Sequence, residues 1–171
     1  TGATSSRNYL PALTEAYYRK LPILAITSGR DISNVGHLVD QVIDRSVLPN
    51  DVAKLSVHIP EIKDKEDEWN YTVKVNKAIL ELRRNGNGPV HINLPTTYSR
   101  DFSVKEIPSV RKIYRINKEG KYPVMPIGNI GIFVGSHLQW SMALTNTVDK
   151  FCETNNAVVL CDHTSNYKGK Y

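Results

Sequence analysis

An arginine stands where the sequence predicts the carboxyl end of a buried strand. Residues 21–28, LPILAITS, form a short apolar run that is typical of a parallel strand buried on both faces. Arg30 follows this run after one glycine. A guanidinium at that place can bind a carboxylate through two parallel hydrogen bonds, which makes Arg30 a candidate substrate-binding residue. A surface ion pair is the alternative role.

A second polar pattern lies inside another predicted strand, GPVHINLP, at residues 88–95. His91 and Asn93 alternate there with apolar residues, and buried polar groups need hydrogen-bond partners. We expect both side chains to bind neighbouring backbone where this last strand closes the sheet. The pattern favours a structural role for His91 over general acid/base catalysis. We also expect Pro95 to end the ladder, because it has no N–H.

These patterns belong to an alternation of elements over residues 1–95. The sequence predicts helix, strand, helix, strand, helix and strand, in that order, at residues 5–20, 21–28, 37–48, 53–59, 64–86 and 89–94. The longest helix has an apolar stripe at helical spacing, made of Tyr71, Val75, Ile79 and Leu82. Such an alternation predicts a parallel α/β layer, in which loops after the strands form the binding crevice.

The chain changes character at residues 96–127, which hold three prolines, many charges and little periodicity. This composition predicts an interdomain linker. From residue 128 to 171 the pattern again reads strand, helix, strand, and the helix carries a predicted stripe of Trp140, Leu144, Val148 and Phe151. We therefore predict an α/β chain with Rossmann-like parallel sheets. The turn after its second-domain strand lacks the GxGxxG dinucleotide fingerprint.

The charge and hydrophobicity of the chain indicate which kinds of molecule it binds. The 171 residues include 22 Lys and Arg against 17 Asp and Glu, a net charge of +5. The basic residues are scattered, so we expect no nucleic-acid partner. The sequence has no apolar run of membrane-spanning length, so we expect no membrane association and a cytoplasmic location. Cys152 and Cys161 lack metal-ligand spacing and are predicted to be two buried thiols.

Three stretches, in this order, resemble thiamine-diphosphate-dependent enzymes of the acetolactate synthase and 2-oxoacid decarboxylase type: residues 1–30, HLVDQVID and GPVHINLP. The branch most similar is that of the menaquinone-pathway SEPHCHC synthases, which join 2-oxoglutarate, after decarboxylation, to isochorismate. By this resemblance residues 1–95 are the later part of a pyrimidine-binding domain. Residues 96–127 are then the linker, and residues 128–171 begin a central domain.

The resemblance also assigns roles to single residues. Gln41 matches a catalytic glutamine that faces the reacting carbonyl adduct. Small residues at the start of the chain would approach the aminopyrimidine of the cofactor: Gly2, Ala3, Thr4 and Ser5. Three further residues would bind substrate: Arg30, Asn8 and Lys168. We expect no residue of this chain to bind a metal.

The resemblance implies thiamine diphosphate and Mg²⁺ as cofactors of the full-length parent, and no cofactor bound by this chain alone. The family's glutamate beside the pyrimidine and its Gly-Asp-Gly metal motif would lie outside these residues. The chain does not begin with Met, and we expect it to be a fragment that is inactive alone. The expected partners are the rest of its own chain, in a homodimer or a homotetramer.

Two other interpretations stay open. One is an acetolactate synthase-like carboligase, because Gly29, Asp31 and Ile32 replace the Asp and Pro-Pro that usually surround this arginine in the SEPHCHC branch. The other is a non-catalytic α/β interaction domain. A nucleotide-binding domain acting alone would need a phosphate-cradling loop, which the sequence does not contain.

Overall fold

The computed structural model describes residues 3–96, 102–125 and 127–171, which form two compact units. The first unit runs to Asn117, and the second begins at Lys118. Both units contain helices and parallel strands. The predicted α/β fold class is therefore confirmed.

Three parallel strands form the sheet of the first unit: β1 (Leu24–Gly29), β2 (Leu55–His58) and β3 (Val90–Pro95). The strand order is β1-β3-β2, so β3 lies in the middle. The register pairs both Thr27 of β1 and His58 of β2 with Asn93 of β3. Polar side chains from all three strands therefore meet in one row across the sheet.

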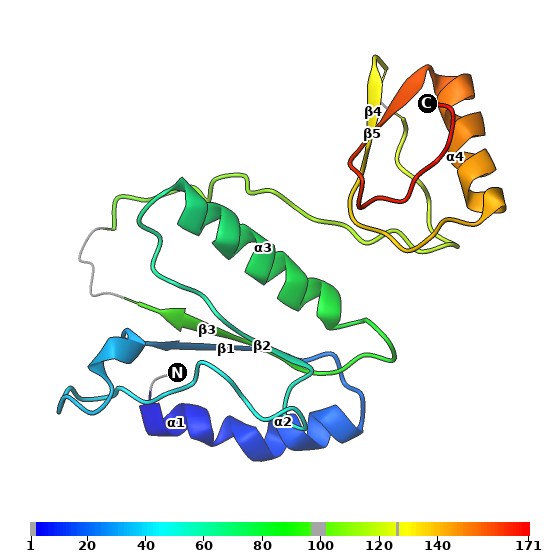
Figure 1. Ribbon diagram of the computed structural model, residues 1–171. Helices are drawn as coiled ribbons and strands as arrows, with labels where there is room; N and C mark the ends of the chain where they lie inside the picture. Colours follow the sequence, from blue (N-terminus) through cyan, green and yellow to red (C-terminus); the bar gives the residue numbers. More distant parts are fainter. Residues whose placement is uncertain (1–2, 97–101, 126) are drawn as a thin grey trace. The chain divides into compact units, whose positions relative to one another are not determined.

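Helices cover both faces of this sheet (Figure 1). Helix α3 (Lys65–Glu81) lies over one face, while α1 (Ala3–Arg7) and α2 (Tyr9–Tyr18) run along the other. Helix α3 begins where Asp64 accepts a hydrogen bond of 2.9 Å from the Asp67 N–H. The core between α3 and the sheet consists of Val57, Ile59, Ala78, Val90 and Ile92.

The predicted apolar stripe of α3 is correct at three of its four positions. Tyr71, Val75 and Leu82 pack against the core, but Ile79 is 49% exposed. The fully buried Ala78 takes its place. Because successive residues turn by about 100° around a helix, position 78 lies nearer the middle of this stripe than position 79.

The first predicted helix is divided into α1 and α2, which meet at Asn8. Pro11 lies in the first turn of α2 and has no N–H to donate to the carbonyl of Arg7, four residues earlier. A continuous helix would lack that bond, so the break falls before the proline. Leu13 and Ala16 are the buried residues of α2.

The helix predicted at residues 37–48 is wrong. The structure has a 3-10 helix, η1 (Ile32–Asn34), and then a loop that leads to β2. Leu38 and Gln41 have φ angles of 55° and 59°, in the left-handed region. Leu38 is fully exposed, whereas Val39, Val42, Ile43 and Leu48 are half-buried. A continuous right-handed helix cannot include left-handed residues, so the backbone at Leu38 and Gln41 interrupts the predicted element.

The strands differ from prediction in their burial and order. As an edge strand, β1 leaves Leu24 38% and Ile26 50% exposed, so the prediction that it is buried on both faces is wrong. The prediction that the last strand closes the sheet is wrong too, because β3 is central. Pro95 does not end the pairing, since the next N–H, of Thr96, donates to the Gly29 carbonyl at 2.6 Å.

The described part of the predicted linker contains neither helix nor strand. Its first portion packs on α3 through Asn76. The Asn76 amide donates to the Arg111 carbonyl at 3.1 Å, and its oxygen accepts from the Ile113 N–H at 2.9 Å. One side chain thus binds this segment as a peptide group of a neighbouring strand would.

The second unit has two parallel strands and one helix: β4 (Ile130–Val134), α4 (Met142–Asn155) and β5 (Ala157–Cys161). Helix α4 begins later than predicted, where the Ser141 hydroxyl accepts a hydrogen bond of 3.2 Å from the Leu144 N–H. Trp140 therefore precedes the helix. Of the two thiols predicted to be buried, Cys152 is buried and Cys161 is exposed.

The core assignment predicts unequal costs for the same chemical change at two isoleucines. Ile59→Ala should lower the free energy of unfolding by about 2–4 kcal/mol, because truncating this buried side chain leaves a cavity. Ile79→Ala, at a half-exposed position of α3, should cost less than about 1 kcal/mol. Urea denaturation followed by circular dichroism measures both. Equal losses would contradict the assigned core.

Candidate functional site

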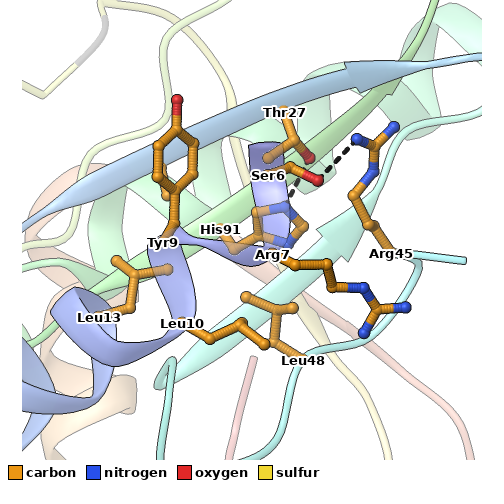
Figure 2. A pocket seen from close by; sticks show the side chains of 10 residues that line it. Ser6, Arg7, Tyr9, Leu10, Leu13, Thr27, Arg45, Leu48 and His91 are labelled. Atoms are coloured by element: carbon orange, nitrogen blue, oxygen red, sulfur yellow. Dashed lines mark hydrogen bonds between the residues drawn. The ribbon is translucent and has the colours of Figure 1, made fainter. Parts of the chain in front are cut away.

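A buried arginine joins α1 to the end of β1. The Arg45 side chain donates from Nη1 to the Ser6 hydroxyl at 2.9 Å and from Nη2 to the Ser28 carbonyl at 2.8 Å. Figure 2 shows this guanidinium pointing toward Ser6. Only 4% of Arg45 is exposed. Residues that are far apart in the sequence are therefore held together at the carboxyl end of β1.

Gly29 provides the room for this guanidinium. A Cβ at position 29 would lie 1.9 Å from Arg45 Nη2, far inside the distance that any side chain tolerates. The requirement is one of space, because the β1 backbone there is ordinary extended strand. Gly29 and Arg45 are thus two parts of a single feature.

Several predicted site residues lie at this end of the first unit. Ala3, Thr4 and Ser5 belong to α1, whose Ser6 binds Arg45. Arg30 is half-buried and directly follows β1, whose Ser28 binds the same guanidinium. The structure therefore brings the predicted cofactor-binding turn and the predicted substrate-binding arginine toward one edge. Gly2 lies outside the described residues.

The remaining predicted residues lie elsewhere. Asn8 occupies the turn between α1 and α2, and its N–H donates to the Ser5 carbonyl at 3.3 Å. Gln41 is exposed on a turn of the loop that follows η1. Lys168 belongs to the second unit, where it lines a polar hollow together with Gln139, Trp140, Thr145 and Asn166. Their assigned roles stay predictions.

His91 is held by side chains and not by backbone, so the predicted partners were wrong. Its Nε2 lies 2.8 Å from the Thr27 hydroxyl, and its Nδ1 lies 2.8 Å from the Ser56 hydroxyl. Thr27 itself donates to Asn93 Oδ1 at 3.0 Å, and the Asn93 amide continues to His58 Nδ1 at 2.9 Å. The polar row across the three strands is therefore satisfied internally.

The direction of these bonds defines the tautomer of His91. Because the Thr27 hydroxyl donates its proton to Asn93, its oxygen accepts from His91 Nε2–H. The other ring nitrogen then accepts from Ser56. Burial, and secondly the charge of Arg45, lowers the pKa of His91 to about 4. A neutral imidazole with both nitrogens bonded supports the structural role over acid/base catalysis.

Sequence reasoning missed the central residue of this site. Arg45 falls in the stretch predicted to be a helix, where a charged residue between apolar ones is typical of a solvated face. Its burial depends on Ser6 and Ser28, which lie 39 and 17 residues away in the sequence. The one local signal was the glycine beside Arg30, which marks a place where another group approaches closely.

Among the described residues, no group of three or more His, Cys, Asp or Glu side chains is placed to hold a metal ion. No described helix is long and apolar enough to span a membrane.

Comparison with known proteins found relatives with a shared name. The chain is similar to the 2-succinyl-5-enolpyruvyl-6-hydroxy-3-cyclohexene-1-carboxylate (SEPHCHC) synthase of Bacteroides thetaiotaomicron, with 38% identity over 116 residues. It is 35% identical over 116 residues to the protein of that name from Phocaeicola vulgatus, and 30% identical over 134 residues to that from Flavobacterium psychrophilum. No family model matches the chain.

The matches cover most of this chain but only a small part of each relative. The first two cover 67% of this chain but 21% of each relative, and the third covers 78% and 23%. The chain thus spans about a fifth of the length of the curated relatives that it matches. The resemblance drawn from the sequence motifs is confirmed, because these relatives carry the name of the branch that the motifs indicated.

The close approach of Gly29 to Arg45 can be tested directly. Gly29→Ala should lower the free energy of unfolding by about 1–3 kcal/mol, because the new methyl group displaces the guanidinium. Gly135→Ala is the control, since nothing lies within 4 Å of a Cβ there. Chemical denaturation measures both. The contact is refuted if Gly29→Ala costs as much in an Arg45→Gln background as in the wild type.

The His91 network predicts a pH dependence. The folded-state pKa of about 4 lies below the ordinary 6.5, so the unfolded chain binds the proton more readily. As pH falls from above 6.5 to 4, His91 should withdraw up to about 3 kcal/mol of stability. Denaturation curves of wild type and His91→Gln across this range isolate the contribution. A difference between them that does not change with pH would exclude it.

Proposed function

We propose that the chain is one segment of a thiamine-diphosphate-dependent enzyme of the SEPHCHC synthase type, which decarboxylates a 2-oxoacid and transfers the acyl-anion equivalent to an acceptor. The observation that carries this proposal is the 38% identity over 116 residues to a relative of that name. The shared name of the relatives favours this branch over an acetolactate synthase-like carboligase.

The start of the first unit would face the aminopyrimidine of thiamine diphosphate. At the start of α1, Ala3, Thr4 and Ser5 have small side chains, which let a flat ring approach the backbone. The metal end does not fit, since the described residues hold no cluster able to bind Mg²⁺. We therefore assign Mg²⁺ and diphosphate binding to other parts of a longer chain. The chemistry that the cofactor supplies when bound is a stabilised carbanion on its thiazolium ring.

The residues of this chain would bind and orient the acceptor. Arg30 would hold an acceptor carboxylate, because this residue directly follows the carboxyl end of β1 and a guanidinium can bind a carboxylate through two hydrogen bonds. Arg45 would position it, since it fixes the Ser28 carbonyl two residues earlier. Gln41 would contribute a polar group at the reacting carbonyl, and Asn8 and Lys168 would contribute further substrate contacts.

The proposed partner of this segment is the rest of such an enzyme, in a homodimer or a homotetramer. The edge strand β1 supports this proposal, because Leu24 and Ile26 are substantially exposed on it. An apolar sheet edge is a surface that globular proteins normally cover.

The test is a chimera of the Bacteroides thetaiotaomicron synthase that carries the first unit of this chain in place of the corresponding segment. We expect the chimera to make SEPHCHC. Arg30→Ala in the chimera should lower kcat/KM for isochorismate by roughly 30-fold to 1,000-fold, equivalent to about 2–4 kcal/mol. Steady-state kinetics with the acceptor varied measures this. The concentration of thiamine diphosphate needed for half-maximal activity should stay unchanged.

Arg19→Ala is the matched control, because Arg19 is an exposed arginine that pairs with Glu15 on the same helix. It should change kcat/KM less than twofold. A folded chimera without activity would favour a non-catalytic interaction domain. An active chimera in which Arg30→Ala behaves like Arg19→Ala would remove Arg30 from the substrate site while leaving the family assignment in place.

A further inference from the structure

A small cavity lies against Arg45 in the first unit. Its volume is about 10 Å³, room for one particle of about the size of a water molecule. Figure 2 shows the side chains around it. The polar part of the lining comes from Ser6, Arg7, Thr27, Arg45 and His91. The rest is apolar or aromatic, and no described Asp or Glu lines it.

The charge of Arg45 is buried without a described carboxylate. Nη1 and Nη2 bind neutral oxygens, of Ser6 and Ser28, while Nε has no hydrogen-bond partner. Among the described residues, the ion pairs within 4.0 Å are Arg19–Glu15, Lys54–Glu81 and Arg84–Glu81, and none of them includes Arg45. A guanidinium keeps its charge even when buried. Burying such a charge is costly unless an opposite charge accompanies it.

The hydroxyl groups of the lining are already engaged. Ser6 donates to the Ala3 carbonyl at 2.5 Å and accepts from Arg45. Thr27 donates to Asn93 and accepts from His91. Arg45 Nε–H is therefore a buried donor without a partner, and it belongs to a side chain that lines a cavity with positive charge around it.

A second cation strengthens this bias. Arg7 lines the same cavity, and one of its nitrogens donates to the Asp44 carbonyl at 3.0 Å. Burial, and secondly the charge of Arg7, lowers the pKa of Arg45, so the two guanidinium groups repel each other. A water molecule would satisfy the Nε–H but would leave the buried charge of Arg45 uncompensated, whereas Arg7 is exposed and lies near the Asp44 carboxylate. A negative ion would both satisfy the Nε–H and compensate the charge of Arg45.

We propose that this cavity binds one small monovalent anion of about the size of chloride, held by Arg45 Nε–H and by the charge of Arg7. The volume excludes polyatomic anions such as phosphate or a substrate carboxylate with its carbon chain. The site is independent of the proposed enzymatic function, because it depends on the first unit alone. Its role is to neutralise the arginine that joins α1 to β1.

The first test compares salts. Calorimetric unfolding of the 171-residue chain is measured in sodium chloride and in sodium gluconate of equal ionic strength, since gluconate is too large to enter. Chloride well above its dissociation constant should raise the unfolding midpoint by roughly 3 °C or more. Equal midpoints in the two salts would overturn the proposal.

Two variants separate this site from general salt effects. Arg7→Gln removes the second cation at an exposed position and should shrink the chloride-dependent shift to less than half. Arg19→Gln, at the exposed residue that directly follows α2, should leave the shift unchanged. Equal shrinkage in both variants would assign the effect to the net charge of the chain and overturn the proposal.

Crystals soaked in sodium bromide give a direct observation. An anomalous peak within hydrogen-bond distance of Arg45 Nε is expected in the wild type. A water-like peak without anomalous signal there would show that the cavity holds only water, and would refute the anion site.

Discussion

The first unit depends on one buried cation. Arg45 binds a serine of α1 and a carbonyl at the end of β1, and thereby fixes a helix that has only five residues. Such a helix is too short to be stable by its own hydrogen bonds. The loop that carries Arg45 is irregular as well, so this guanidinium organises two segments that have little local stability.

The candidate site brings together residues at one end of the first unit. The first residues of α1, Ala3–Ser5, and Arg30 lie near the segments that Arg45 joins, whereas Lys168 belongs to a separate unit. The matched part of the chain covers about a fifth of the length of each of these relatives.

Elements with both local and tertiary support were predictable from the sequence. Helix α3 has a capping Asp64, an acidic first turn and an apolar stripe that agree, and the strands at β2 and β3 have the expected residues. The stretch 37–48 has helical spacing, but the left-handed backbone at Leu38 and Gln41 interrupts it. Strand order, the burial of β1 and the role of Arg45 were not predictable, because each depends on contacts between segments distant in sequence.

The polar row of Thr27, His91, Asn93 and His58 has a consequence for how faithfully the sheet assembles. Side chains alternate between the faces of a strand, so a slip of β3 by one residue would turn His91 and Asn93 away from all their partners. An apolar strand could slip and still find apolar neighbours. Here β3 forms side-chain hydrogen bonds with both β1 and β2 in the same register. Any other register would leave these buried polar groups without partners. The hydrogen bonds of this row therefore favour a single register of β3 against both of its neighbouring strands.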